Sequence, residues 1–556
     1  MSHNFFKMYK IIFIFLFTPF FFFAQNNDYK SYDKAVKYFN QGHHKKTKEI
    51  LNKIIDQNPV WRQPNLLLAS LYIKEDSIEQ AVSYYLNTYD VNDVADIGGI
   101  QKIAKLLYEN GFYTKSLYYL EKIIEHGIDS NKLDYNIKRF ADNCRFAITA
   151  LEAPFDIESK NMGKHINSSM SEYVNTITVG GEKLFFTRMV DARSGYIPQE
   201  DFYISELDSN SKWKSAEPLK FNTIMNEGAI SVSSDGALYV YTACDRSRSY
   251  GGCDLFIREY SEKFGWSNEY NLGENINTQY WESQPCFSVD GKYLYFVSNR
   301  PGGLGKSDIY RARIVDKDFV DVENLGDKIN TSYNEMSPFL HPDNLTLYFA
   351  STGHIGMGDY DLFVSRRKNV DDKWYDAENM GYPINTFKSE NSLIVARDGK
   401  TAYYSSDKDG FGKEDIFTFQ LPEIMQANTV DDIELDILKS GYGKEIVLNN
   451  VHFSNNSFSL SDNSFIELNK LIVYLLKNPS IKISIEGHTD NIGDLNKNMI
   501  LSNNRAKTVY NYLLENGVDK KQLLSYEGFG ELSPISNNDN IVGRKLNRRT
   551  SFRIIE

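Results

Sequence analysis

Cysteine and histidine are scarce in this chain, and their spacing excludes a structural metal site. The 556 residues include four cysteines and nine histidines. None of these residues forms the CxxC or Cys/His spacing that a zinc site requires. We therefore expect neither a metal nor another cofactor in this protein.

A long hydrophobic run is also lacking, which argues against a membrane-spanning helix. The longest apolar run, Ile11 to Phe23, has 13 residues, whereas a spanning helix needs about 20. It follows Lys7 and Lys10 and precedes Ala24, which is typical of a secretory signal peptide over residues 1–24. An uncleaved membrane anchor is the alternative.

The charge balance and the lack of catalytic motifs exclude further classes of function. A formal net charge of −12 without a basic stripe argues against a nucleic-acid partner. The chain has no GxSxG, HExxH or paired-carboxylate arrangement. The stretch Gly302 to Ser307 lacks the first glycine of a phosphate loop, because that position holds Arg300. We therefore expect a protein that is not an enzyme.

Two of the four cysteines are expected to form a disulfide bond. Cys244 and Cys253 flank the turn-rich loop DRSRSYGG between two apolar runs, and hairpin strands would bring them close. An exported protein can form such a bond. Because it closes a short loop, it would stabilise the fold by about 2–3 kcal/mol at most. Cys144 and Cys286 are expected to be free, buried thiols.

What the chain does have is internal repeats, and the first of them are helical. Residues 28–150 read as helical hairpins of about 34 residues, the first with its turn at Gly42 and its end at Pro59. This plan resembles a tetratricopeptide array, which implies a superhelix that holds a protein segment. A generic helical bundle is the alternative.

A second repeat fills residues 155–422, where tyrosine and phenylalanine are abundant. Each unit combines an early strand such as FSVDGKYLYFVS, a glycine-rich hairpin before a strand such as SDIYRA, and usually a tail such as NLGENINT. Five asparagines and five aspartates recur every 53 to 55 residues: Asn167, Asn222, Asn277, Asn330 and Asn385, and Asp201, Asp254, Asp308, Asp361 and Asp415. About four strands per period predict a β-propeller of five blades, with six as the alternative.

The details of this repeat support a closed all-β fold. The segment NMGKHIN precedes the first full unit and is expected to complete the last blade. A transmembrane β-barrel is disfavoured because KYLYFVS is a continuous apolar run rather than an alternating one. The recurring aspartates are expected to cap turns rather than bind metal. The repeats resemble the exported WD40-like propeller family.

The last block, residues 445–556, follows a polar and weakly patterned stretch, residues 423–444, that is expected to be a linker. It predicts a small α/β domain, in which the strand IKISIEG lies between two helices. The first helix is expected to bury Phe465, Leu468, Ile472, Leu475 and Leu476. The second, about Met499 to Glu515, is expected to bury Leu501, Ala506, Val509, Leu513 and Leu514.

The candidate site of this domain consists of two opposite charges. Asp490 follows the apolar strand, and Arg505 is expected in the first turns of the next helix, so the two should be neighbours. A ligand with an ammonium and a carboxylate would match Asp490 and Arg505, with help from backbone N–H groups near the helix start. The alternative is an internal Asp490–Arg505 salt bridge worth about 0–1 kcal/mol.

The pattern GHTDNIGDLNKNMILSNNRAKTVYNYLLENGV, followed by GFGELSPISNNDNIVGRKLNRRTSFRI, resembles the OmpA-like peptidoglycan-binding domain. The resemblance covers residues 445–556. It implies that Asp490 and Arg505 hold the diaminopimelate of uncrosslinked peptidoglycan stems, with Asn498 and Arg549 as pocket support.

The order of the parts carries a further resemblance. A signal peptide, tetratricopeptide-like helices, a propeller and an OmpA-like domain together resemble exported proteins of type IX secreting bacteria, including the peptidoglycan-binding subunit PorE. This implies a non-catalytic scaffold in the periplasm, associated with the outer membrane, whose helical repeats and propeller hold envelope proteins. A propeller hydrolase or sugar-binding protein, localised to the wall by its OmpA-like domain, is the alternative.

Overall fold

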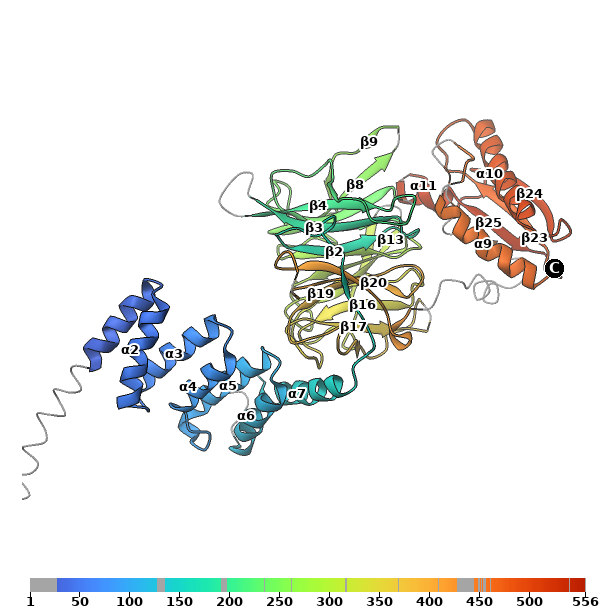
Figure 1. Ribbon diagram of the computed structural model, residues 1–556. Coiled ribbons are helices and arrows are strands. Elements are labelled where there is room, and N and C mark those ends of the chain that lie inside the picture. Colours follow the sequence, from blue (N-terminus) through green and yellow to red (C-terminus); the bar gives the residue numbers. More distant parts are fainter. Residues whose placement is uncertain are drawn as a thin grey trace, which may run out of the picture. The chain divides into compact units, whose positions relative to one another are not determined.

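A computed structural model describes residues 28–127, 136–191, 198–427 and 445–555, apart from 235, 262, 316–317, 369, 409, 449–450, 452, 454–456, 461 and 540. The expected signal peptide and most of the expected linker lie outside these residues. The chain divides into two compact units, Met1–Glu152 and Ala153–Glu556, and Figure 1 shows their elements. Within the described ranges, no helix combines the length and apolar character needed to cross a membrane.

The first unit is built from helices that pack against their neighbours in the chain. Residues 28–40 are helical and are followed by α2 (His44–Gln57), α3 (Arg62–Lys74), α4 (Ile78–Leu86), α5 (Ile97–Tyr108), α6 (Tyr113–Glu125) and α7 (Ile137–Glu152). Gly42 makes the first turn with a φ of 75°. Successive helices contact each other from α2 to α7, with Leu51, Leu68 and Leu71 buried between them.

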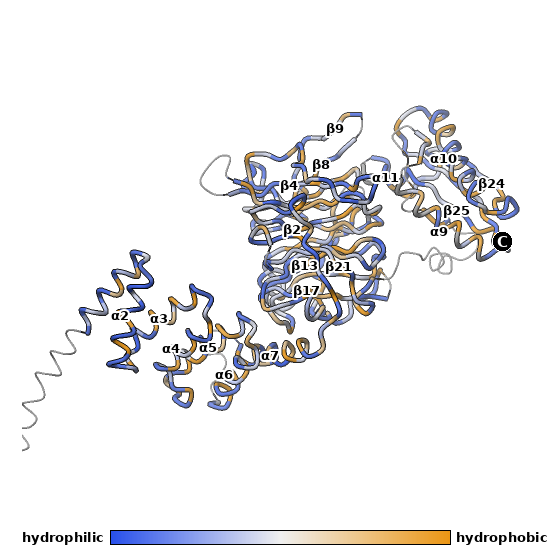
Figure 2. The backbone as a smooth tube through the Cα atoms, viewed as in Figure 1, coloured by the Kyte–Doolittle hydropathy of each residue, from blue (hydrophilic) through white to orange (hydrophobic). Residues whose placement is uncertain are grey.

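The second unit begins with five antiparallel sheets. Their strands are β1 (Lys160–Asn161), β2 (Glu172–Ile177), β3 (Lys183–Val190), β4 (Gln199–Glu206), β5 (Glu217–Pro218), β6 (Glu227–Val232), β7 (Leu238–Cys244), β8 (Cys253–Ser261), β9 (Gly265–Trp266), β10 (Tyr270–Asn271), β11 (Glu282–Phe287), β12 (Tyr293–Ser298), β13 (Asp308–Val315), β14 (Asp318–Asn324), β15 (Glu335–Leu340), β16 (Thr346–Ser351), β17 (Asp361–Arg366), β18 (Glu378–Asn379), β19 (Glu390–Val395), β20 (Thr401–Ser406) and β21 (Asp415–Gln420). Figure 2 shows hydrophobic residues along these strands and hydrophilic ones in the connecting loops.

The connections between the sheets follow the chain, with one exception. Four sheets are formed by consecutive strands, whereas the sheet of β19, β20 and β21 is completed by β1. Lys160 lies opposite Thr418, and Asn161 lies opposite Phe417, so the early segment closes the last sheet as the sequence predicts. The first strands of the sheets are neighbours in a cycle, because β2 contacts both β6 and β19, and β11 and β15 complete the series.

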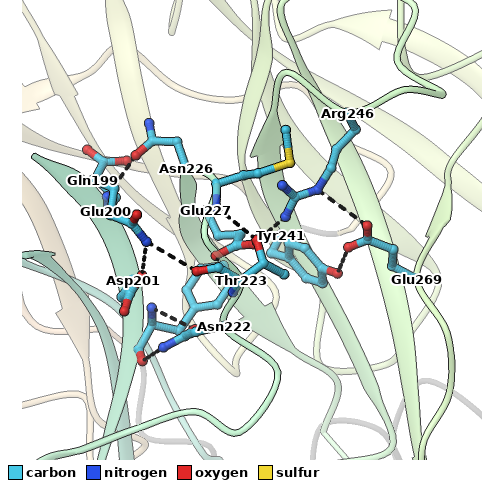
Figure 3. A network of polar contacts seen from close by, with 12 residues as sticks. Gln199, Glu200, Asp201, Asn222, Thr223, Asn226, Glu227, Tyr241, Arg246 and Glu269 are labelled. Atoms are coloured by element: carbon cyan, nitrogen blue, oxygen red, sulfur yellow. Dashed lines mark hydrogen bonds and ion pairs between the residues drawn. The ribbon is translucent and has the colours of Figure 1, made fainter. Parts of the chain in front are cut away.

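A repeated network of polar contacts joins the tail of each repeat unit to the first strand of the following sheet. In Figure 3, Thr223 contacts the Glu227 carboxylate, which also pairs with Arg246, and Arg246 Nε lies 3.3 Å from Glu269. The same hydroxyl–carboxylate contact recurs at Ser168–Glu172, Thr278–Glu282, Thr331–Glu335 and Thr386–Glu390. In the described part of the chain, however, Glu335 and Glu390 form no ion pair. Burial raises the pKa of both, that of Glu390 to about 7.

The recurring aspartates cap the glycine-rich hairpins. Asp254 accepts hydrogen bonds from the backbone N–H groups of Tyr250 and Gly251, at 2.7 and 3.0 Å. Three further aspartates accept the equivalent pair of bonds: Asp308, Asp361 and Asp415. The expectation that these residues cap turns is confirmed for these four positions.

The four cysteines form one disulfide bond and two free thiols, as expected. Cys244 on β7 and Cys253 on β8 are joined by a disulfide bond, and Cys144 and Cys286 are free and buried. Burial raises the pKa of the Cys286 thiol to about 12.

The linker expected from residue 423 is wrong at its start, because Met425 and Ala427 are buried in the core of the sheets.

The rest of the second unit is a four-stranded sheet with helices. Its elements are β22 (Glu445–Val447), α9 (Asp462–Lys477), β23 (Ile483–His488), α10 (Leu495–Glu515), β24 (Leu523–Gly530), α11 (Ile541–Asn547) and β25 (Thr550–Ile554). The strand order is β22-β25-β23-β24; β23 runs parallel to β24 and antiparallel to β25. β23 is therefore a central strand, as expected.

The buried faces of the two long helices differ in part from the expected ones. On α9, Leu468, Leu471 and Leu475 are buried, whereas Leu476 is 53% exposed, because the apolar stripe follows the i, i+3, i+7 spacing and leaves Leu476 off it. On α10, three of the five expected residues, Ala506, Val509 and Leu513, are fully buried, and Leu501 and Leu514 are half-buried.

Candidate ligand-binding site

Asp490 lies just beyond the C-terminal end of the central strand β23 and is held by two contacts. Its Oδ2 pairs with Arg548 Nη1 at 2.6 Å, and its Oδ1 accepts a hydrogen bond from the Ile492 N–H at 3.1 Å. Asp490 is 8% exposed. The carboxylate is therefore fixed in direction by its neighbours.

Arg505 lies in the middle of α10 rather than in its first turns. The helix begins at Leu495 because Asp494 caps it, with Oδ1 accepting from Lys497 N–H at 3.1 Å, and Gly493 precedes the cap with a φ of 114°. Ten residues of helix separate Leu495 from Arg505, which is about 15 Å along the axis. The expectation that N–H groups of the helix start assist Arg505 is therefore wrong.

The guanidinium of Arg505 is buried with little compensation for its charge. Its Nε donates to the Ser457 carbonyl at 3.0 Å, and the group lies over the Phe453 ring at 5.0 Å. Among the described residues it forms no ion pair, and its two terminal nitrogens have no hydrogen-bond partner. Burial, followed by the nearby charge of Arg548, lowers the pKa of Arg505 to about 10, while Asp490 acts in the opposite direction.

The structure thus brings Asp490 and Arg505 into electrostatic range but does not pair them directly. The carboxylate of Asp490 is bound to Arg548, which the sequence reasoning left out of the site. The signal for it was present, because Arg548 stands in the NRR stretch beside Arg549 and belongs to the family pattern. The internal salt bridge expected as the alternative is not formed between the described side chains of Asp490 and Arg505.

Asn498 holds the loop that carries Asp490. Its side-chain amide donates to the carbonyl oxygens of Asp490 and Ile492 at 3.2 and 3.4 Å and to Glu531 Oε2 at 2.7 Å. Asn498 therefore supports the loop of the site but contributes no charge to it. The hydroxyl of Thr489 is buried and has no partner in the described part of the chain.

Arg549 lies beside the site but binds other groups. Its Nε donates to Glu445 Oε1 at 2.7 Å, and its terminal nitrogens donate to the Ser533 carbonyl at 3.1 and 3.2 Å. Within the described residues it contacts neither Asp490 nor Arg505. It therefore fastens β22 to the segment that follows β24.

A histidine and two glutamates behind the site are close enough to be considered as metal ligands. Atoms of Glu445, Glu486 and His488 lie within 4.8 Å of one another. Both carboxylates, however, are already paired with Arg549 and Arg553. Burial, and then Arg549, lowers the pKa of His488 to about 4, so its ring is neutral and stacks on Phe529. The cluster serves as a charge-balanced support of the sheet edge.

Two glycines allow α10 to approach the sheet closely enough to position Arg505. A Cβ at Gly487 would lie 2.2 Å from the Ser502 carbonyl, and one at Gly528 would lie 2.2 Å from Asn503 N. Ser502 Oγ accepts a hydrogen bond from Gly530 N–H at 2.9 Å. The helix is thereby fixed over β23 and β24.

Comparison with known proteins finds a family match for the segment that carries this site. Residues 452–548 match the OmpA family. Peptidoglycan-binding protein ArfA of Mycobacterium bovis is 35% identical over 102 residues, which are 18% of this chain and 31% of that protein. Probable lipoprotein YiaD of Escherichia coli is 32% identical over 113 residues, 20% of this chain and 51% of that protein. The chain spans about half the length of YiaD and about a third of that of ArfA.

One solved structure extends the comparison. The peptidoglycan-associated lipoprotein from Burkholderia pseudomallei is 28% identical, covers 19% of this chain and 87% of its own, and gives a TM-score of 0.18. By the family match over residues 452–548, the C-terminal part of the chain contains an OmpA-like domain, as the sequence predicts. The helices and the five sheets lie outside the matched residues, so their tetratricopeptide and WD40-like assignments stay predictions.

Proposed function

We propose that this protein is a non-catalytic scaffold that anchors an envelope complex to peptidoglycan through its OmpA-like domain. The observation that supports this most directly is the buried Arg505 guanidinium, which lies within electrostatic range of Asp490 but forms no ion pair among the described residues. A buried and unbalanced charge is costly unless a partner arrives. A ligand anion supplies that partner.

The ligand that suits the site has an ammonium next to a carboxylate. The carboxylate binds the two terminal nitrogens of Arg505, and the ammonium binds Asp490 in place of Arg548. The Thr489 hydroxyl, which has no partner among the described residues, adds a hydrogen bond. The free end of diaminopimelate in an uncrosslinked peptidoglycan stem has this pair of groups, and the similarity to a protein named for peptidoglycan binding favours it.

The other parts of the chain supply the scaffold. Consecutive helices packed in hairpins agree with a tetratricopeptide-like array, and five sheets in a cycle closed by β1 agree with a five-bladed WD40-like propeller. These parts hold envelope proteins. A signal peptide and the Cys244–Cys253 disulfide fit an oxidising periplasm. This order of parts also favours association with the outer membrane. The complex would be a type IX secretion complex like that of PorE or an envelope-integrity complex.

The test is sedimentation of the full chain with purified peptidoglycan. Asp490→Ala and Arg505→Ala each abolish co-sedimentation, while Lys507→Ala, which changes an exposed charge on the same helix, retains it. Circular dichroism checks that the variants are folded. Co-sedimentation of both site variants at the wild-type level would reject the proposal.

A second candidate, a hydrolase or sugar-binding site, is favoured by one cluster formed from β2, β4 and the residue before β21. Tyr173 hydrogen-bonds to Glu200, and both are within electrostatic range of Glu414. Burial raises the pKa of both glutamates, as a general acid requires. A Cβ at Gly228 would lie 2.6 Å from both Glu200 and Tyr173, so the glycine leaves room there. Release of soluble fragments from peptidoglycan, lost in Glu200→Gln, would favour this candidate.

A further inference from the structure

We infer that Arg548 binds a second carboxylate of the peptide stem, so that the site selects stems that end at diaminopimelate. This inference rests on the proposed function. It concerns the residue that pairs with Asp490 in this structure, and it assigns that residue a role in the complex with the ligand.

The charges of the site give the first reason. Three ionised side chains are within electrostatic range of one another: the cations Arg505 and Arg548 and the anion Asp490. A zwitterion neutralises only Asp490 and Arg505. It also displaces Arg548 from its carboxylate, which leaves one guanidinium without a partner. Leaving a partly buried charge unpaired is unfavourable, so a ligand with a second anion is preferred.

The environment of Arg548 gives the second reason. Its side chain is 37% exposed, against 11% for that of Asp490, so its guanidinium can move while the carboxylate stays fixed. Within the described residues, Asp490 is the sole partner of that side chain, and its backbone N–H bonds to the Arg544 carbonyl at 3.0 Å at the end of α11. Arg548 can therefore exchange one carboxylate for another without breaking other side-chain contacts.

The stem supplies the matching pattern only when it ends at diaminopimelate. A terminal diaminopimelate residue carries two carboxylates and one free ammonium, because its second nitrogen lies in the peptide bond. This is the charge complement of two arginines and one aspartate. Extension of the stem converts the carboxylate nearest the peptide bond into an amide and removes the partner of Arg548.

The experiment measures the affinity of the full chain for three synthetic peptides by calorimetry. The first is L-alanyl-γ-D-glutamyl-meso-diaminopimelate. The second is the same peptide with an amide in place of the diaminopimelate carboxylate nearest the peptide bond. The third carries the amide at the free glutamyl carboxylate instead. The wild-type protein binds the second peptide about tenfold more weakly than the first, which is the value of one charged hydrogen bond, and binds the third as well as the first.

The variants identify the residue. Arg548→Gln binds the first peptide about tenfold more weakly than the wild type and no longer distinguishes it from the second. Arg548→Lys, which keeps the charge, retains part of the discrimination, and Lys507→Ala retains all of it. Wild-type protein that binds the first two peptides equally, or Arg548→Gln that binds the first peptide as tightly as wild type, overturns the inference.

The outcomes separate this inference from the proposal beneath it. Binding that is lost in Asp490→Ala but does not respond to amidation overturns the role of Arg548 and leaves peptidoglycan anchoring intact. Loss of affinity for the third peptide instead of the second assigns the carboxylate to glutamate and overturns the selection of stem ends. Absence of binding to all three peptides by the wild-type protein overturns both.

Discussion

The carboxylate of Asp490 lies 2.6 Å from the guanidinium of Arg548, while Arg505, the arginine expected opposite it, has no counter-ion among the described residues. The site thus combines a closed ion pair with a buried cation that has no counter-ion in the described part of the chain. The two arginines therefore contribute differently to stability. Arg548 stabilises the protein through its ion pair with Asp490, whereas burial of the Arg505 charge destabilises it.

Arg505→Met is expected to stabilise the OmpA-like domain while abolishing peptidoglycan binding. Replacement of a buried charge by an apolar side chain of similar volume is often neutral or stabilising, by about 1–2 kcal/mol in this case. Hydrogen exchange of the β23 amides in the intact protein measures the change. A loss of protection equivalent to more than about 1 kcal/mol would mean that Arg505 serves the fold through its bond to Ser457.

Asn498→Ala is expected to weaken both the loop and the ligand affinity. The substitution removes three hydrogen bonds from one amide, and the cost is about 1–2 kcal/mol. The matched control is Asn511→Ala, an exposed asparagine on the same helix. Sedimentation with peptidoglycan and hydrogen exchange of residues 490–493 follow the two effects. Unchanged exchange in Asn498→Ala would show that the loop is fixed by other contacts.

The stability of the sheets is expected to fall as the pH rises from about 4.5 to 7. Glu390 has its pKa raised to about 7 by burial, above an ordinary value of 4.5. Its protonated form is thus favoured by folding, and the contribution is complete below pH 4.5 and is lost as the pH rises through 7. Lys408 opposes the shift, and Asp407 adds to it.

The measurement is denaturant unfolding followed by tryptophan fluorescence at several pH values, because four of the five tryptophans lie in the part of the chain that forms the five sheets. Glu390→Gln flattens the pH dependence in this window, whereas Glu282→Gln, in which the replaced carboxylate pairs with Arg300, does not. Equal pH profiles for wild type and Glu390→Gln would place the titrating group elsewhere.

Much of the fold could be predicted from the sequence because its signals are local or periodic. The spacing of the aspartates follows from one hairpin geometry used repeatedly, and the pairing of β1 with β21 follows from an unmatched tail before the first repeat. The end of β23 and its GHTD turn could be located in the same way, since alternation of Ile483 and Ile485 marks the strand directly.

The parts that could not be predicted depend on non-local contacts. The start of α10 at Leu495 is set by the Asp494 cap, a signal that the apolar pattern does not contain. The partner of Asp490 is 58 residues away in the chain, and no spacing rule distinguishes Arg548 from Arg549. The burial of Met425 and Ala427 likewise depends on a sheet whose packing the sequence does not display.

The union of β1 with β21 has a mechanical consequence. The segment that leads from the first unit enters the sheets as their outermost edge, through two residue pairs, reinforced by the Asn161 amide on Asp415 and by Asn167 on Ile416. If the C-terminal domain is held at the wall, as proposed, tension from the helices would act on that short edge strand. Its separation from β21 would release the front of the repeat from its rear.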